Sequence, residues 1–266
     1  MIDIDAVRPF GAGVAFGQTA SDYAAHRAGF PVQFFKALTD RGLLAPGMKV
    51  LDIGTGTGTI ARRLAQAGAV VSAVDPAAEL MAAAAKQDAE VGVTVRYRQA
   101  SAETLPFAQG TFDLAVAGQC WHWFDRPRAA AELARVLKSG GTGVIAHFDW
   151  LPLLGSVAEA TESLILAHNP NWVMAGGTGI YPLWPGDLTG AGLTGVETFS
   201  FDVVHPYTHI AWRGRIRASA GVAASLDAAG VAAFDAALAK MLETRFPADP
   251  LQVPHRVWAV RAGKPE

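Results

Sequence analysis

The chain has 266 residues, of which 51% are hydrophobic and 17% charged, and its formal net charge is -2. This apolar fraction supplies a packed core and excludes a largely disordered chain. The near-zero net charge gives no reason to expect a nucleic-acid partner, because phosphate binding needs clustered Lys and Arg. The length fits one large α/β domain, or a core domain that carries an insertion.

Features of membrane and secreted proteins are missing from the sequence. No apolar run approaches the roughly 18–20 residues needed to cross a bilayer, so we expect no membrane partner. The opening residues, Met1-Ile2-Asp3, begin no basic region followed by an apolar stretch, which argues against a secretory signal. The single cysteine, Cys120, cannot form an intramolecular disulfide and leaves no cysteine set for zinc. We therefore expect a cytoplasmic protein without disulfides or a metal.

Short apolar runs alternate with helical segments through the first part of the chain. The pattern predicts strands over 49–53, 69–74, 93–97, 112–118 and 143–148, with helices over 60–67, 77–86 and 128–137. Gly140-Gly141 is expected to end the last of these helices. Such alternation is typical of right-handed βαβ units. It predicts an α/β, Rossmann-like, doubly wound and mostly parallel seven-stranded sheet with helices on both faces.

The rhythm changes after the fifth predicted strand. Residues 150–193 are rich in Trp, Pro and Gly, with one helix expected over 157–167. From residue 196 the alternation returns, with a strand to about 204, helices near 209–224 and 231–245, and a last strand over 256–261. We expect a single domain with its core in 46–149 and 196–266, an N-terminal helical cap in 1–45 and an insertion in 150–195. The insertion would lie over the carboxyl ends of the strands, where ligands bind in such sheets.

A glycine-rich loop, Asp52-Ile53-Gly54-Thr55-Gly56-Thr57-Gly58, follows the first predicted strand. Glycines at alternate positions let the backbone turn sharply and approach a ligand closely. Asp75 ends the second strand, 21 residues after Gly54. A carboxylate at this distance accepts hydrogen bonds from the hydroxyls of an adenosyl ribose. The alternative is a tight packing loop beside a solvated aspartate.

The spacing within the loop distinguishes between nucleoside cofactors. A dinucleotide-binding G-x-G-x-x-G motif requires a glycine where this chain has Thr59. Asp52 brings negative charge, which would not help a loop that binds pyrophosphate. It suits the ammonium and sulfonium groups of S-adenosylmethionine better.

Further motifs follow in a fixed order. They are Val74-Asp75-Pro76, Ala100 to Phe107 with Phe112-Asp113, Trp121 to Phe124, and Arg135 to Gly141. With these motifs and the glycine loop, the chain from Val50 to about His147 resembles the class I S-adenosylmethionine-dependent methyltransferases. The resemblance is closest to the small-molecule, type 11 group that includes trans-aconitate and ubiquinone/menaquinone-pathway enzymes.

The resemblance implies a role for each matching position. Gly54, Thr55 and Gly56, with Asp52, would line the methionine and ribose portion of the cofactor, and Asp75 would hold the ribose hydroxyls. The adenine would lie near Pro76, Met81, Ser101, Ala102 and Glu103, although many relatives have aspartate where Ser101 stands. Gln119 and Cys120 would approach the sulfonium. Tyr23 would close the pocket, and Arg27 would pair with the cofactor carboxylate.

Methyl transfer from a sulfonium needs alignment and exclusion of water, and a general base only if the acceptor loses a proton. His122 is the first candidate base and His147 the second, with structural packing as the alternative for both. Tryptophans gather after the fourth predicted strand, at Trp121, Trp123, Trp150, Trp172, Trp184 and Trp212. We expect Trp121, Trp123, Trp150 and Trp172 to contact a flat, apolar or cationic acceptor. One of Arg213, Arg215 and Arg217 could instead bind an acidic acceptor.

The function that the resemblance implies is methyl transfer to O, N or C of a small-molecule metabolite, which leaves S-adenosylhomocysteine. Because a fold does not fix its chemistry, a non-methylating step such as cyclisation is the alternative. A regulatory module with a vestigial loop and an NAD-dependent dehydrogenase are more distant alternatives. The partner would be a small molecule, and the protein would be a monomer or a homodimer.

Overall fold

The computed structural model describes residues 29–219, 221–223 and 225–266. The strands are β1 (Lys49–Ile53), β2 (Val70–Asp75), β3 (Val95–Gln99), β4 (Phe112–Gly118), β5 (Leu137–Trp150), β6 (Thr194–Tyr207) and β7 (Leu251–Gly263). The helices are α3 (Val32–Asp40), α4 (Thr59–Gln66), α5 (Ala78–Glu90), α6 (Arg126–Val136), α7 (Val157–His168), α8 (Trp184–Gly190), α9 (His209–Arg217) and α10 (Ala228–Arg245). A 3₁₀ turn, Trp121–Trp123, lies between β4 and α6.

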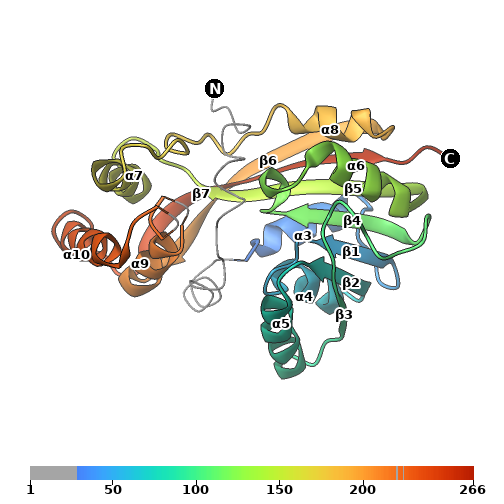
Figure 1. Ribbon diagram of the computed structural model, residues 1–266, viewed down its shortest axis with the longest axis horizontal. Helices are drawn as coiled ribbons and strands as arrows, with labels where there is room; N and C mark the ends of the chain where they lie inside the picture. The colour runs from blue at the N-terminus through green and yellow to red at the C-terminus, as the bar shows by residue number, and fades with distance from the viewer. Residues whose placement is uncertain (1–28, 220, 224) are drawn as a thin grey trace. The chain divides into compact units, whose positions relative to one another are not determined.

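The strands form one seven-stranded sheet in the order β3-β2-β1-β4-β5-β7-β6 (Figure 1). β1 pairs in parallel with β2 and β4, β2 with β3, and β4 with β5. Hydrogen bonds join Gly140 to Lys264 and Leu151 to Pro254, so β7 runs antiparallel to β5. The predicted Rossmann-like, mostly parallel α/β sheet is confirmed.

The first βα unit forms as its sequence dictates. From Val50 to Ile53 every β1 residue is at most 1% exposed, as in a central parallel strand. Ile60, Ala61 and Leu64 form the buried side of α4, which packs on β1 and β2. The carboxyl end of β1 therefore leads directly into the glycine loop and the helix that follows it.

The prediction for Gly140-Gly141 is wrong. α6 ends at Val136, and both glycines lie inside β5. A Cβ on Gly141 would lie 2.9 Å from the carbonyl oxygen of Lys138 and 3.0 Å from that of Phe112. Gly141 is needed because the backbone comes close to it within the sheet. The sequence pattern alone does not distinguish such a glycine from one that ends a helix.

The chain divides into two compact units. One comprises residues 29–148, 181–200 and 257–266 among those described, and the other comprises 149–180 and 201–256. The predicted insertion, 150–195, contributes to both units: residues 150–180 lie in the second unit and residues 181–195 in the first. We call the first of the two units the loop unit, after its glycine loop, and the second the helical unit.

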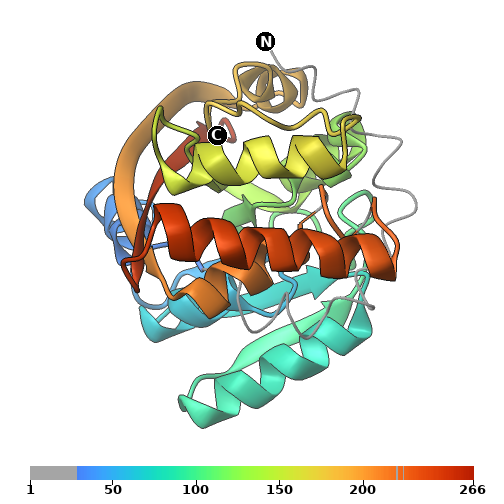
Figure 2. The ribbon, with the colours of Figure 1, turned by 90° about the vertical axis from the view of Figure 1, so that its left-hand side faces the viewer.

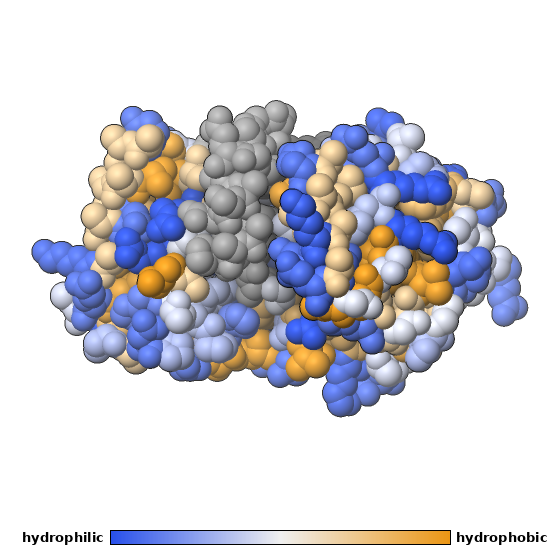
Figure 3. All heavy atoms as spheres, turned by 90° about the horizontal axis from the view of Figure 1, so that it is seen from below, coloured by the Kyte–Doolittle hydropathy of each residue, from blue (hydrophilic) through white to orange (hydrophobic). Residues whose placement is uncertain are grey.

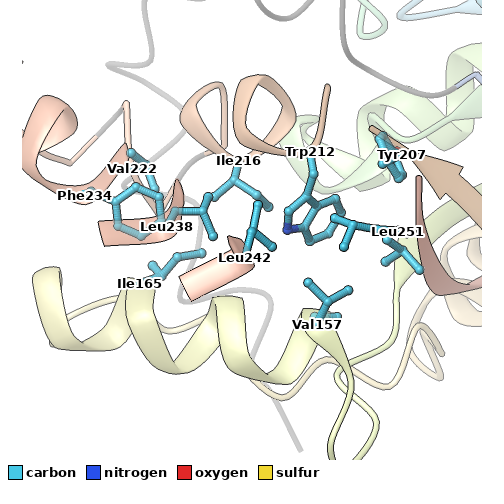
Figure 4. Packing of buried hydrophobic residues seen from close by; sticks show 12 residues of the cluster. Val157, Ile165, Tyr207, Trp212, Ile216, Val222, Phe234, Leu238, Leu242 and Leu251 are labelled. Atoms are coloured by element: carbon cyan, nitrogen blue, oxygen red, sulfur yellow. The ribbon is translucent and has the colours of Figure 1, made fainter. Parts of the chain in front are cut away.

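The helical unit has its own hydrophobic core. α10 packs against both α7 and α9, as Figure 2 also shows. Trp212 and Ile216 of α9 meet Phe234, Leu238 and Leu242 of α10 in this core, and all five side chains are fully buried (Figure 4). The indole N–H of Trp212 donates to the hydroxyl of Thr161 at 3.1 Å, which satisfies its polar atom inside the core.

The surface carries scattered apolar side chains. Val32, Leu154, Val204 and Ile210 are each at least 60% exposed. On the face shown in Figure 3, hydrophobic and hydrophilic residues are interspersed, as is usual for protein surfaces. None of the helices that the structure describes is long and apolar enough to cross a membrane.

Candidate functional site

The glycine loop makes a sharp turn at the carboxyl end of β1. The φ angles of Gly54, Gly56 and Gly58 are +69°, +53° and +73°, values that residues with a side chain rarely adopt. A Cβ on Gly54 would lie 2.8 Å from the sulfur of Cys120, and one on Gly58 would lie 2.4 Å from the hydroxyl of Tyr97. A Cβ on Gly56 would meet no atom of the described residues within 4 Å. The loop is therefore closely packed at both ends and open at its centre.

Asp52 is buried beneath this loop, with 1% of its surface exposed. One of its carboxylate oxygens accepts hydrogen bonds from the Thr55 hydroxyl at 2.6 Å and the Ala61 N–H at 3.1 Å. Burial raises the pKa of Asp52 to about 7, although both hydrogen bonds oppose the shift. Asp52 thus joins the loop to the first turn of α4, a positioning role that the charge argument did not anticipate.

Asp75 lies at the end of β2, facing the open centre of the loop. Its two carboxylate oxygens accept from the N–H of Gly56 at 2.8 Å and of Ala77 at 2.9 Å. Each carboxylate oxygen has a second lone pair, so both can accept one more hydrogen bond. Burial raises the pKa of Asp75, and the two N–H donors oppose that shift. An acceptor pair next to open space fits the hydroxyls of a ribose.

Behind the loop lies a polar cluster that the sequence reasoning missed. Arg62 donates to the carbonyl oxygen of Thr57 at 3.1 Å, and its Nε lies 2.7 Å from a carboxylate oxygen of Asp88. The hydroxyl of Tyr97 donates to the same carboxylate at 2.8 Å. These residues come from α4, α5 and β3, and no short sequence spacing links them.

The residues predicted to border the adenine lie next to Asp75. The Ala100 N–H donates to the Asp75 carbonyl at 3.2 Å, and the Gln99 side chain donates to the Pro76 carbonyl at 2.8 Å. These bonds bring the stretch from Ser101 to Glu103 beside Pro76.

Within this group exposure varies. Ser101 and Pro76 are exposed, while Ala102 and Met81 are 5% and 6% exposed. Glu103 accepts from the Asp125 N–H at 2.9 Å and so fixes the start of α6.

Gln119 and Cys120 follow β4, the strand next to β1. Gln119 has a φ of +63°, in the left-handed region that few residues other than glycine adopt. Its side-chain oxygen accepts from the Phe148 N–H, and its own N–H donates to Ala146, so it is held against β5. The thiol of Cys120 donates to the Ile53 carbonyl at 3.2 Å. Cys120 therefore lies beside Gly54, the first glycine of the loop, and Gln119 precedes it in the chain.

The two candidate bases lie close together. The rings of His122 and His147 are 5.2 Å apart, and His122 also contacts Trp123 at 4.4 Å. His147 is only 2% exposed and contacts Tyr181 at 4.4 Å and Trp184 at 4.7 Å. His122 is half-buried. Of the two, His122 has the exposure that exchange of a proton with an acceptor requires.

Trp121 is fully buried, and its indole N–H donates to Asp187 of α8 at 2.8 Å. Trp123 is half-buried beside His122. Trp150 and Trp172 belong to the helical unit. Of the four predicted substrate tryptophans, two therefore belong to the loop unit and two to the helical unit. The sequence reasoning missed Tyr181 and Trp258, whose rings are 5.5 Å apart and which pack with Trp184.

Tyr23 and Arg27 lie outside the residues that the structure describes. In the described ranges, no group of three His, Cys, Asp or Glu side chains is arranged to hold a metal ion.

The chain matches known methyltransferases in sequence and in fold. The family described as "Methyltransferase domain" matches residues 51–145, which include the loop, Asp75 and most of β5. An uncharacterised methyltransferase of Mycobacterium tuberculosis is 35% identical over 132 residues, covering 48% of this chain and 49% of that protein. The chain thus spans about half the length of the curated relatives it matches.

Solved structures share the fold at lower identity. Phosphoethanolamine N-methyltransferase 2 of Haemonchus contortus, in complex with S-adenosyl-L-methionine, has a TM-score of 0.57. It is 19% identical, and the match covers 97% of this chain and 60% of that one. The 4+2 cyclase SpnF has a TM-score of 0.54 and 22% identity, with 90% and 85% of the two chains covered.

The trans-aconitate and ubiquinone/menaquinone subgroup stays a prediction, because these relatives do not distinguish it. The broader assignment rests on the matched residues 51–145 together with the fold. S-adenosylmethionine is the cofactor of that family. Residues 51–145 match the methyltransferase domain family, and the described residues share the fold of a methyltransferase structure that holds S-adenosyl-L-methionine.

Proposed function

We propose that the protein transfers a methyl group from S-adenosylmethionine to O, N or C of a small-molecule metabolite. The observation that carries the proposal is the pairing of Asp75 with the open centre of the glycine loop. Asp75 accepts from Gly56 and Ala77 and keeps one lone pair on each oxygen for a ribose hydroxyl. Within the part of the chain that the structure describes, no atom lies within 4 Å of a Cβ on Gly56, which supports space for the cofactor there.

The residues around the loop have separable tasks. Asp52 and Arg62 hold the loop from beneath, through Thr55 and Thr57. Pro76 and Ser101 would border the adenine, and Gln119 and Cys120 would lie toward the methionine portion. When bound, the cofactor supplies a methyl group on a sulfonium, which is already an activated leaving group.

His122 is the group that we propose as proton acceptor. An acceptor hydroxyl or ammonium must lose a proton during transfer, and a neutral imidazole takes it up near neutral pH. The half-buried position of His122 beside Trp123 supports this role, and His147 would orient it from behind. Trp123 would pack on a flat acceptor, whereas buried Trp121 would position α8 through Asp187.

The test of cofactor binding is calorimetry with S-adenosylhomocysteine on the wild type and Asp75→Asn. The Asn side chain keeps the shape but replaces one acceptor oxygen by a donor, so it loses a ribose contact and leaves a loop N–H unpaired. We expect about a 30-fold weaker affinity, since hydrogen bonds to charged groups contribute roughly 1.5–3 kcal/mol. Equal affinities would contradict the proposed site.

A non-methylating reaction on the same fold is the second candidate, and the likeness to a 4+2 cyclase favours it. Incubation with labelled S-adenosylmethionine and a metabolite panel separates the two. Methyl transfer releases S-adenosylhomocysteine and adds one methyl group to the product, whereas cyclisation leaves the cofactor intact and the mass unchanged. A small-molecule partner, a cytoplasmic location and a monomeric or homodimeric state complete the proposal.

A further inference from the structure

The arginines of α9 lie on two different flanks of the helix. Trp212 and Ile216 point into the core of the helical unit (Figure 4). Because an α-helix turns by about 100° per residue, Arg213 and Arg217 lie on one side of this buried face and Arg215 on the other. The three arginines are close together along the sequence, but the helix places them on two different flanks.

Asp235 of α10 binds the first flank. The Arg213 Nε lies 3.0 Å from one carboxylate oxygen of Asp235, and the Arg217 Nη1 lies 2.9 Å from the same oxygen. A second guanidinium nitrogen of Arg213 reaches the other oxygen, which makes that pair bidentate. These two arginines thus stabilise the contact between α9 and α10.

Arg215 lies on the second flank, over an aromatic ring. Its guanidinium carbon is 4.9 Å from the centre of the Trp150 ring, and its side chain is half-buried. The indole N–H of Trp150 donates to the buried Glu162 at 2.7 Å, so the ring is held in place. In the described parts of the chain, no carboxylate forms an ion pair with Arg215.

Two histidines of the helical unit, His205 and His255, have lowered pKa values. Burial, together with the charges of Arg215 and His205, lowers the pKa of His255 to about 4, while Asp149 acts in the opposite direction. Burial likewise lowers the pKa of His205. Both histidines are therefore neutral at neutral pH, and Arg215 provides the positive charge.

We propose that Arg215, supported by Trp150, binds the oxyanion group, a carboxylate or a phosphate, of a small molecule. A guanidinium stacked on an aromatic ring keeps its edge N–H donors free for an oxyanion. Trp150 is the last residue of β5, and ligands bind at the carboxyl ends of parallel strands. Since a cation already lies over Trp150, this ring is not the binding face of a cationic acceptor.

This inference goes beyond the proposed function and rests on residues of the helical unit alone. The direct test is labelling of the full chain with phenylglyoxal, which reacts with accessible guanidinium groups, followed by peptide mass spectrometry. We expect Arg215 to react faster than Arg213 and Arg217, which Asp235 binds. Benzoate or phenyl phosphate should slow its labelling at matched ionic strength, and benzamide should not.

The two anions distinguish a carboxylate from a phosphate, and equal labelling with both anions and with benzamide would overturn the proposal. Arg215→Gln should weaken binding of the protecting anion about tenfold by calorimetry, while Arg213→Gln leaves it unchanged. Unchanged anion affinity in Arg215→Gln would also contradict the proposal. If Arg215→Gln does not fold, protection of Arg215 from labelling in the wild type still tests the proposal.

S-adenosylhomocysteine affinity is measured on the same samples. Cofactor binding without anion protection would reject the inference and leave the proposed function intact. Anion protection without cofactor binding would reject methyl transfer and keep the oxyanion site.

Discussion

The glycine loop and helix α9 both hold ionisable side chains, but their partners differ in kind. Asp52 and Asp75 are held by uncharged donors, which are backbone N–H groups and the Thr55 hydroxyl. On α9, Arg213 and Arg217 are held by the carboxylate of Asp235 on another helix. Neutral donors fix an acid in place without neutralising it, so Asp75 can still accept from a ligand. Paired charges instead stabilise packing, and among the three described arginines of α9 we propose Arg215 as the one that binds an anion.

The largest expected effect tests the close packing of the loop. Gly54→Ala places a methyl group within 3 Å of Cys120, and it does so at a position whose φ is +69°. We expect about a 100-fold weaker affinity for S-adenosylhomocysteine by calorimetry, because both the loop and Cys120 must move. Gly110→Ala is the matched control: its φ is +68°, and its Cβ would meet no described residue within 4 Å. Equal affinities for the two variants would show that the clash at Gly54 has no consequence for binding.

If Gly54→Ala does not fold, Gly56→Ala provides the same test from the ligand side. Its φ is +53°, and its methyl group enters open space next to Asp75. We expect a folded protein in which the methyl group occupies part of the cofactor site. Affinity equal to that of Gly110→Ala would place the cofactor elsewhere.

This loop was predictable because all of its determinants lie within a short stretch of sequence. The strand 49–53, the positive-φ glycines and Asp75 at the next strand end follow from local patterns. The partners of Asp52 were not predictable. A buried aspartate and a ligand-facing aspartate read identically in sequence, and only the fold places Ala61 and Thr55 against the carboxylate.

The next prediction concerns the charge of Asp52 beneath the loop. Its pKa is about 7 in the folded protein, above the unfolded value of 3.8. The folded state therefore holds a proton that the unfolded state has lost, and its stability falls as pH rises from about 4 to 7. Asp52→Asn lacks this titration. We expect it to gain about 2 kcal/mol over wild type between pH 5 and pH 8.

Urea unfolding of both proteins across this pH range measures the gain. Asp75 titrates in both proteins, so the difference between them isolates Asp52. Parallel stability profiles would indicate that Asp52 is ionised throughout. Uncharged donors would then be sufficient to hold a fully charged acid beneath the loop.

The region after β5 was the part of the molecule least accessible from sequence. α8 has only seven residues and begins Trp184-Pro185-Gly186, a pattern that reads as a turn. The boundary of the predicted insertion depended on where the βα rhythm returned, yet α9 and α10 pack with α7. The division between Arg215 and its two neighbours depends on Asp235, which lies 18 residues after Arg217 on another helix. Long-range pairs of this kind leave no periodic signal in the sequence.

The smallest expected effect tests whether Asp235 acts through charge pairing. Asp235→Asn removes the partner of both Arg213 and Arg217, and its side chain is 18% exposed. We expect a loss of about 1 kcal/mol in the free energy of unfolding, because a partly buried ion pair stabilises a protein more than an exposed ion pair does. The control in the same unit is Asp202→Asn, whose side chain is 51% exposed in its pair with Arg256 and should contribute less.

The same variant sharpens the contrast between the two flanks of α9. In Asp235→Asn, phenylglyoxal should label Arg213 and Arg217 faster than in the wild type, because their carboxylate partner is gone. Labelling of Arg215 should not change, since its contact is the ring of Trp150. If Arg215 also became more reactive, the two flanks would be coupled through the helix. The anion protection at Arg215 would then depend on α10 as well as on Trp150.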